Sequence, residues 1–521
     1  MQDLLMLTST LLLAAAMAVF LRHSSPSKAV LPVYTRVAGS VRSALARWLR
    51  QPAIVIRDRA TAHRLLVRGS AGGAFSDRPP SMAPSAVLSH RRFHNLTSAP
   101  YGPFWRVTRR NLTSEVLHPL RLHRYAAARR EALRGLVSDL GRHQCASDGP
   151  DAGGPLGLVL AAESIRAAMF GLLVAMCFGD GVDPGLVSAM ADAQHDLVQF
   201  FPELRVFARL PGVARLIHWK RWGKLVALRR RQEEMYLPLI HARRGRQRQP
   251  GDEPPAYVDT LIDLRVPDDN YNNGNRRNNN TSTQKRTRQR KLTDGEMVGM
   301  CSEFLGAGTE TVAAALQWTM ANLVKRPQIQ DSLRREIDAA VDSNAEEVSD
   351  EVLPKLEYLN AVVMEVLRLY PTATLVLRQV SKEDDVVHNG RRVPAGTNVM
   401  FPLESLAKDE TAWDEPGEFR PERFLACEGG ESVSLEAAAG CGGEVMKMMP
   451  FGAGRRVCPG MGMAMLHMGY YVANLVREFE WKDAEGEMAV DLRPHFGFFT
   501  VMKRPLRARL VPCQGRHTSL V

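Results

Sequence analysis

A glycine-rich segment near the C-terminus surrounds a cysteine with features suited to metal binding. Phe451 to Gly460 reads F-G-A-G-R-R-V-C-P-G and contains Cys458. Glycines 452, 454 and 460 permit positive φ and close backbone approach, so amide N–H groups can point at the sulfur. Such donors lower a thiol pKa and stabilise the thiolate that binds a soft metal ion. A lone cysteine in a turn is more often simply buried, but the spacing F-x-x-G-x-R-x-C-x-G favours an axial ligand of a haem iron.

Trp105 and Arg109 lie four residues apart after the turn Tyr101-Gly102-Pro103, which predicts the start of a helix. Residues at this spacing share one helix face. For this pair taken alone, a core tryptophan beside a surface arginine is the better explanation. With a haem ligand inferred at Cys458, we instead expect the indole N–H and the guanidinium to bind a carboxylate such as a haem propionate.

A long helix is predicted from a cap at Thr293 through Lys325, and its centre reads A-G-T-E-T at residues 307–311. Glycine weakens a helix, so the glycines at 306 and 308 should have a purpose. They could let a flat cofactor pack against the helix, or let neighbouring helices approach. The Thr311 hydroxyl could open a water-holding groove in the backbone ladder, and Glu310 could feed protons into it. We therefore predict Thr311 and Glu310 as catalytic residues.

Glu365 and Arg368 form an E-x-x-R pair inside the apolar run A-V-V-M-E-V-L-R-L-Y. Such a pair on a helix surface contributes only about 0.2–0.5 kcal/mol. The apolar flanks predict burial, and a buried ion pair needs further partners. Arg423, in the sequence P-E-R-F at 421–424, is a candidate third charge.

Helices should supply most of the framework that positions these residues. Residues 120–262 read largely as helices, with breaks near 149–155, at Pro202 and at Pro211. A short β-rich run follows Gln51, another strand is expected at Thr374–Val380, and Asn389-Gly390 suits a hairpin turn. Gly497 to Val501 looks like a strand turn that projects aromatic rings inward.

The chain divides into an anchor, a linker and one long domain. We predict a signal-anchor helix at residues 1–22, since Leu4 to Leu21 is almost wholly apolar and the basic residues follow it rather than precede it. Residues 23–50 would be a linker, and residues 51–515 the folded domain. Within it, residues 268–291 hold seven Asn and seven Lys or Arg against two Asp, which predicts a disordered insert.

Composition and charge narrow the class of protein. With 521 residues, 45% hydrophobic and 24% charged, the chain can build a sizeable core. The net charge of +12 is either a solvated basic surface or an attraction to anionic lipid and an acidic electron donor. Seven scattered cysteines without a C-x-x-C indicate a reducing compartment rather than a disulfide framework. The basic insert nearly lacks aromatic residues, which argues against a nucleic-acid partner.

Four motifs in this order resemble the cytochrome P-450 superfamily of haem-thiolate monooxygenases. They are A-G-T-E-T at 307–311, E-x-x-R at 365–368, P-E-R-F at 421–424 and the cysteine loop at 451–460, and the resemblance covers nearly everything after about residue 50. The segments K-M-M-P-F-G-A-G-R-R-V-C-P-G and A-L-Q-W-T-M-A-N-L-V look like the plant A-type branch near families 89 and 77.

The resemblance implies a mainly α fold with small β-sheets, a triangular helical body that encloses haem b between the long helix and the cysteine loop. It implies a buried structural triad of Glu365, Arg368 and Arg423. Haem contacts are implied for Cys458, Phe451, Gly452, Gly460, Trp105, Arg109, Arg456 and, more weakly, Arg378. By position, the candidate substrate pocket comprises Ala307, Leu375, Val376, Phe498 and Phe499, which suit a hydrophobic small molecule.

Three classes of function remain open at this point. A microsomal monooxygenase would insert one oxygen atom from O2, using NADPH-derived electrons from a separate flavoprotein reductase, with its domain on the cytosolic side of the endoplasmic reticulum membrane. A haem-thiolate isomerase or dehydratase would need no reductase but usually lacks the acid–Thr pair. A haem-sensing Cys-Pro site would need neither the long-helix motif nor the ion-pair triad. The acid–Thr pair, Glu310 and Thr311, favours the monooxygenase.

Overall fold

The structure is a computed structural model. It describes residues 53–68, 73, 75–79, 95–147, 158–207, 211–246, 255–268, 288–381, 387–388, 390–425, 435, 446–484 and 486–513. The predicted anchor at 1–22, the linker at 23–50 and most of the predicted insert therefore lie outside the described residues.

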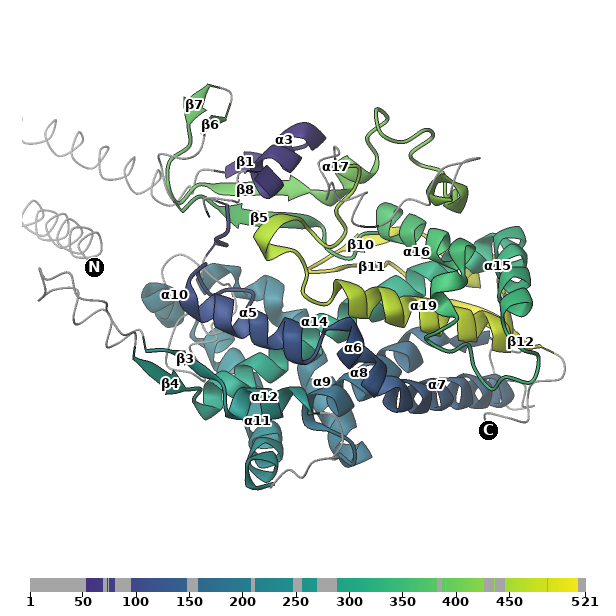
Figure 1. The fold of residues 1–521 in the computed structure, drawn as a ribbon, viewed down its shortest axis with the longest axis horizontal. Coiled ribbons are helices and arrows are strands. Elements are labelled where there is room, and N and C mark those ends of the chain that lie inside the picture. The colour runs from purple at the N-terminus through teal and green to yellow at the C-terminus, as the bar shows by residue number, and fades with distance from the viewer. Residues whose placement is uncertain are drawn as a thin grey trace, which may run out of the picture.

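Helices make up most of the described chain (Figure 1). The helices of the first half are α3 (Arg59–His63), α5 (Pro103–Glu115), α6 (Pro119–Leu122), α7 (Ala126–Ser147), α8 (Ala161–Phe178), α9 (Pro184–Phe200), α10 (Pro211–Ile217), α11 (Trp219–Gly245) and α12 (Tyr257–Ile262). Those of the second half are α14 (Asp294–Lys325), α15 (Pro327–Ala340), α16 (Glu357–Leu369), α17 (Leu403–Ala407) and α19 (Met461–Glu478).

Helix α14 begins and ends where its sequence predicted. Thr293 precedes it as the N-cap, and its hydroxyl accepts a hydrogen bond from Glu296 N at 3.3 Å. The Glu296 carboxylate accepts in return from Thr293 N at 2.7 Å, which completes a capping box. The helix then continues to Lys325 with most of its side chains buried, so it runs through the core of the molecule.

Small sheets lie at several places around the helices in Figure 1. The first has the order β1 (Ala53–Val55), β8 (Asn398–Pro402), β5 (Leu375–Gln379), with β1 parallel and β5 antiparallel to β8. The second joins β2 (Leu158–Leu160), β12 (Arg507–Pro512) and β9 (Phe479–Lys482) in antiparallel fashion. Two short hairpins are β6 (Val387–His388) with β7 (Arg391–Arg392), and β10 (Pro494–Phe496) with β11 (Thr500–Met502). The predicted mainly α fold with small sheets is confirmed.

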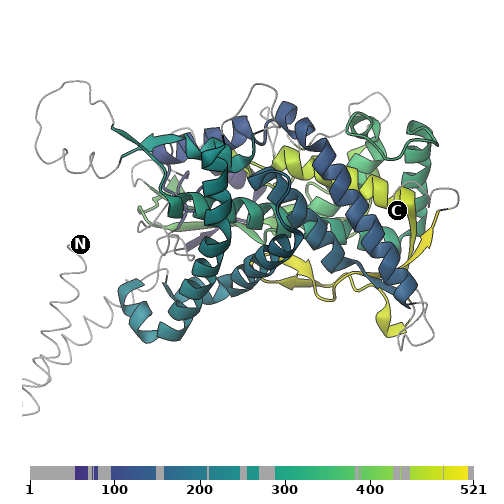
Figure 2. The same ribbon diagram turned by 90° about the horizontal axis from the view of Figure 1, so that it is seen from below.

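The predicted disordered insert is wrong at its C-terminal end. Gln289–Lys291 form strand β4, which pairs antiparallel with β3 (Arg265–Pro267). Val266 is buried, and Arg290 makes two 2.7 Å bonds to the buried Glu296 carboxylate, so the ribbon is fastened to the start of α14. This ribbon and α10 lie at the same end of the molecule in both views (Figures 1 and 2). Composition alone could not reveal this ordering, because it depends on pairing with Arg265–Pro267 on the other side of the insert.

Helix α8 packs in the core beside α14. Among the described residues it alone is long and apolar enough to cross a membrane, with a mean hydropathy of 1.6, but 61% of it is buried inside the protein. Leu173 of α8 fills the space beside Gly308 of α14. The apolar character of α8 is therefore explained by its packing in the core.

Candidate active site

The cysteine loop is a compact turn whose backbone bonds to itself. Cys458 N donates to Phe451 O at 2.9 Å, and Gly452 N donates to Met449 O at 2.8 Å. Gly452 and Gly454 adopt φ of 74° and 71°, where a side chain would be strained. Gly460, the N-cap of α19, has a φ of −91° and so does not use this freedom.

Burial and neighbouring groups shift the pKa of the Cys458 thiol in opposite directions. Burial raises its pKa, while a hydrogen bond from the Gly460 amide and the positive charges of Arg109 and Arg78 lower it. The expected amide donor is thus present at Gly460. The net direction is nevertheless upward, because the sequence-based expectation left out the cost of burying a thiolate.

Met463 connects the cysteine loop to the centre of α14. Its Cε lies 3.7 Å from the position that a Cβ on Gly460 would take, and 3.5 Å from that of a Cβ on Gly308. Cys458 Sγ lies 4.0 Å from the same Gly460 position. The fold therefore brings A-G-T-E-T and Cys458 together, although they are far apart in sequence.

Gly306 and Gly308 of α14 pack closely against neighbouring helices. A Cβ on Gly306 would lie 2.3 Å from the Gln194 side-chain amide of α9, and a Cβ on Gly308 would lie 2.7 Å from Leu173 of α8. Of the two explanations that the sequence left open, close helix packing therefore accounts for these glycines. Between them, Ala307 is exposed within a helix that is otherwise mostly buried.

Thr311 and Glu310 differ in their contacts. The Thr311 hydroxyl donates to Ala307 O at 2.7 Å, and α14 continues through this turn, so the expected break in its ladder is not seen. Glu310 points instead toward α9, where its Oε1 lies 3.4 Å from Nδ1 of His195. Sequence analysis missed His195, because no local spacing connects it to Glu310.

Arginines gather between the cysteine loop and the segments that precede α5. Arg456 donates to the carbonyls of Ser76, Leu96 and Ala99 at 2.6, 2.9 and 2.6 Å. Arg109 donates to Val457 O at 2.8 Å, and Arg378 to Ala453 O at 3.3 Å.

Trp105, which was expected to donate to a carboxylate, already donates to a backbone carbonyl. Its single N–H donates to Leu96 O at 3.1 Å, and its predicted bond to a haem propionate stays a prediction. Its ring lies 4.5 Å from the Arg456 guanidinium carbon and 5.9 Å from that of Arg109. Trp105 therefore positions the two arginines through cation–π contacts.

Arg78 is a fourth member of this group and was missed by the sequence analysis. Burial lowers the pKa of Arg78, while Glu303 and Cys458 raise it. Burial and the charge of Arg78 also lower the pKa of Arg378 to about 9 and that of Arg456 to about 10. The available signal was an arginine in the rigid sequence S-D-R-P-P, but no spacing tied it to Cys458.

The candidate substrate residues divide into two groups. Leu375 and Phe498 are 38% and 40% exposed, while Val376 is buried and lies 3.5 Å from the position of a Cβ on Gly452. Val376 therefore supports the cysteine loop. Thr500 N donates to Thr372 O at 2.8 Å, which fixes the hairpin carrying Phe498 and Phe499 beside the start of β5.

Phe201 is a further aromatic residue at this hairpin. Its ring centroid lies 4.9 Å from that of Phe498, which in turn lies 4.8 Å from that of Phe499. The sequence analysis did not foresee this contact between Phe201 and Phe498.

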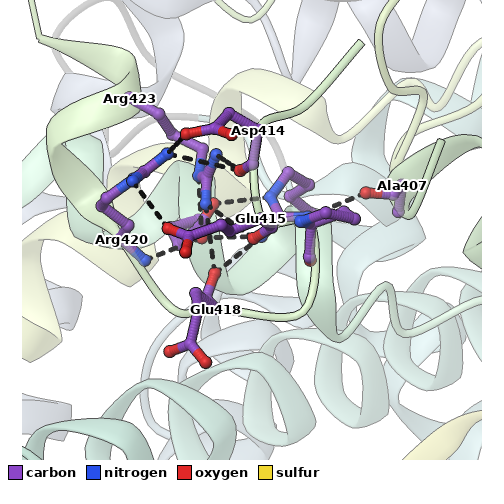
Figure 3. Close-up of polar contacts among 9 residues, drawn as sticks. Ala407, Asp414, Glu415, Glu418, Arg420 and Arg423 are labelled. Atoms are coloured by element: carbon purple, nitrogen blue, oxygen red, sulfur yellow. Dashed lines mark hydrogen bonds and ion pairs between the residues drawn. The ribbon is translucent and has the colours of Figure 1, made fainter. Parts of the chain in front are cut away.

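Glu365, Arg368 and Arg423 come together in a buried cluster. The two Glu365 oxygens accept from Arg368 at 2.6 and 2.7 Å, and one accepts from Arg423 Nε at 3.1 Å. The other N–H groups of Arg368 and Arg423 donate to backbone carbonyls between Ala407 and the P-E-R-F segment, as Figure 3 shows for Arg423. The accepting carbonyls belong to Ala407, Asp414, Glu415, Pro416 and Glu418.

Comparison with known proteins identifies the family. The family model described as Cytochrome P450 matches residues 44–510. The chain belongs to the cytochrome P450 family. It is 36% identical to cytochrome P450 89A9 of Arabidopsis thaliana over 466 residues, covering 89% of this chain and 84% of that protein. It is 29% identical to cytochrome P450 78A9 of the same plant, covering 84% and 74%. The expected resemblance to plant cytochromes P450, including family 89, is confirmed.

A solved structure agrees with the fold. A zebrafish cytochrome P450 structure described with progesterone has a TM-score of 0.64, covers 88% of this chain and 94% of its own, and is 22% identical. Its family and these relatives identify the protein as an oxidoreductase of the haem-thiolate monooxygenase class. Members of this class use haem iron, O2, a substrate and a redox partner.

The arginine group fits the haem that this family carries. Arg78, Arg109, Arg378 and Arg456 bring four positive charges together, and none forms an ion pair within the described part of the chain. Burial lowers the pKa of each one. Glu303 and Asp77 offset part of the charge on Arg78 and Arg456. Haem b carries two propionate groups, and their carboxylates would offset much of the rest.

Proposed function

We propose that this cytochrome P450 inserts one oxygen atom from O2 into a hydrophobic small molecule, with Cys458 as the axial ligand of its haem iron. The observation that carries the proposal is the place of Met463, whose Cε lies 3.5 Å from where a Cβ on Gly308 would be and 3.7 Å from where one on Gly460 would be, so the A-G-T-E-T turn lies near the cysteine loop. Haem held by a thiolate ligand supplies the binding of O2 and its reductive cleavage.

The chain's own residues bind, orient and deliver protons. Arg78, Arg109, Arg378 and Arg456 would hold the propionates, with Trp105 bracing two of them. Thr311 presents its hydroxyl beside the Ala307 carbonyl, where it can hold a water molecule near the reacting oxygen. Glu310 would replace the protons consumed there.

Apolar groups would line the substrate space. Leu375, at the start of β5, and Phe498, on the β10–β11 turn, are exposed apolar side chains on neighbouring segments. Ala307 is the exposed small residue of α14. These side chains favour a hydrophobic molecule over a charged one.

The redox partner would be an NADPH-dependent flavoprotein reductase that passes electrons singly. The net charge of +12 supports attraction to an acidic partner and to anionic lipid. Residues 1–22 would anchor the protein to the endoplasmic reticulum membrane, with residues 51–515 facing the cytosol.

Reconstitution tests this function directly. Hydrophobic compounds are first screened for a spectral shift of the ferric protein, and binders are then incubated with NADPH, O2 and a plant reductase. We expect NADPH consumption together with a product that carries one oxygen atom from labelled O2. A product formed from a hydroperoxide without NADPH would instead support the isomerase or dehydratase alternative.

A further inference from the structure

We infer that His195 supplies protons to Glu310 and is the first residue to receive them from solvent in the proton-delivery path of this enzyme. The inference deepens the proposed function and rests on it. His195 lies on α9, outside every motif that the sequence analysis singled out.

The first observation is the contact itself. His195 Nδ1 lies 3.4 Å from Glu310 Oε1, across the interface between α9 and α14. The two ring nitrogens of imidazole can donate and accept protons, so a histidine can act as a proton shuttle. A carboxylate at this distance is a suitable acceptor.

The second observation is a gradient of exposure. The His195 side chain is 36% exposed, whereas that of Glu310 is 15% exposed. His195 therefore meets solvent more readily than the carboxylate it contacts. A proton entering from water would reach the imidazole first and Glu310 second.

The third observation is that the neighbouring residue fixes this geometry. Gln194 Oε1 accepts from Gln232 of α11 at 2.8 Å and from Ser302 of α14 at 3.1 Å. The Gln194 amide nitrogen lies against Gly306, where no side chain intervenes. Because α9 is tied to two helices at residue 194, the next residue is held at one turn of α14, beside Glu310.

The proton transfer balances simply. The His195 imidazolium gives its Nδ1 proton to the Glu310 carboxylate and becomes neutral imidazole, the protonated carboxyl passes a proton inward and becomes carboxylate again, and a hydronium ion from solvent restores the imidazolium. Monooxygenation consumes one O2, two electrons from NADPH and two protons, and releases one water molecule with the oxygenated product. His195 is thus a positioning residue that acts through Glu310 and touches neither substrate nor haem in this assignment.

The test compares His195→Gln, Glu310→Gln, the double variant and Thr311→Ala with the wild type. Each full-length holoenzyme receives reductase, NADPH and the hydrophobic compound that the wild type oxidises fastest in the screen above. We expect His195→Gln to raise the peroxide released per NADPH several-fold, in the direction of Glu310→Gln. The double variant should be no worse than Glu310→Gln, because both changes interrupt one route.

Hydrogen peroxide provides a rescue. It brings two electrons and two protons already on oxygen, so replacing O2, NADPH and reductase with peroxide should raise the product yield of His195→Gln toward that of wild type. A variant that is merely misfolded would not recover. Thermal unfolding of the resting ferric proteins gives a measurement that needs no turnover. The midpoint shift of the double variant should be smaller than the sum of the shifts of the two single variants.

His241→Gln is the matched control. His241 Nε2 also contacts a carboxylate, Asp294 Oδ2 at 3.1 Å, but Asp294 lies about 24 Å from Glu310 along α14. This variant should behave as the wild type.

Two results would overturn the inference alone: a wild-type peroxide ratio in His195→Gln, or a double variant whose ratio is the product of the two single effects. A wild type that consumes no NADPH with any compound would instead overturn the proposed function, and this inference with it.

Discussion

At the scale of single residues, four arginines lie close enough for their positive charges to repel one another. Arg78, Arg109, Arg378 and Arg456 each have a pKa lowered by burial, and Arg78 adds to the shift of the other three. Backbone carbonyls satisfy several of their N–H groups but carry no full negative charge. The group is therefore better suited to a bound dianion than to an empty site.

Arg78→Ala should weaken haem retention. A hydrogen bond to a charged group contributes about 1.5–3 kcal/mol, which corresponds to roughly 10- to 100-fold faster transfer of haem to apomyoglobin. Arg106→Ala, an exposed arginine on α5, is the control and should transfer haem at the wild-type rate. Equal haem loss in both variants would show that Arg78 holds no propionate.

Cys458→His should change the electronic character of the haem site. Neutral imidazole in place of thiolate removes electron donation, so the reduced carbonyl complex should lose its red-shifted Soret band. Cys513→Ala, which changes another described cysteine, should keep the band. A red-shifted band that survives in Cys458→His would mean that another residue is the ligand.

Residues with a fixed local spacing could be predicted from the sequence, and residues that act across long sequence separations could not. The cap at Thr293 follows from four neighbouring residues, and it is present in the structure. Arg78 and His195 acquire their partners only when distant segments meet. The upward shift of the Cys458 pKa was also missed, because burial belongs to the folded chain and not to the motif.

At the scale of elements, α14 is the helix on which several functions converge. Its glycines admit Gln194 of α9 and Leu173 of α8, and this close packing leaves Ala307 exposed and Glu310 within reach of α9. Sequence analysis identified the helix and its ends but could not choose between a cofactor and a helix as the neighbour of each glycine. That choice depends on how α8 and α9 cross α14.

Gly306→Ala should destabilise the fold. A Cβ would lie 2.3 Å from the Gln194 amide nitrogen, so the network of Gln194, Gln232 and Ser302 must shift, at a typical overpacking cost of about 1–3 kcal/mol. Gly299→Ala lies on the same helix with nothing within 4 Å and should stabilise by about 0.5–1 kcal/mol. Denaturant unfolding measures both. A stabilised Gly306→Ala would show that Gln194 moves aside freely.

At the scale of the whole molecule, exposed apolar and basic residues gather at the junction of α10 and α11. Leu216, Ile217 and Trp219 are 80%, 68% and 64% exposed. Arg215, Lys220 and Arg221 are exposed beside them. Apolar side chains among cations suit an interface with anionic lipid. This junction would give the folded domain a membrane contact of its own, separate from the proposed anchor at residues 1–22.

Deleting residues 1–24 should therefore release much of the protein from microsomes, with haem content nearly intact, but leave a residual bound fraction. Adding Leu216→Asp and Ile217→Asp to the deletion should abolish most of that fraction. Burying a Leu or Ile side chain contributes about 1.5–3 kcal/mol, so each change should lower partitioning by about tenfold or more. Flotation with vesicles containing phosphatidylserine measures the effect.

Val387→Asp, which changes an exposed residue of β6, should leave binding unchanged. Equal binding of the truncated protein with and without the two aspartates would place the lipid contact elsewhere, and complete loss of haem on deletion would make residues 1–24 part of the folded core.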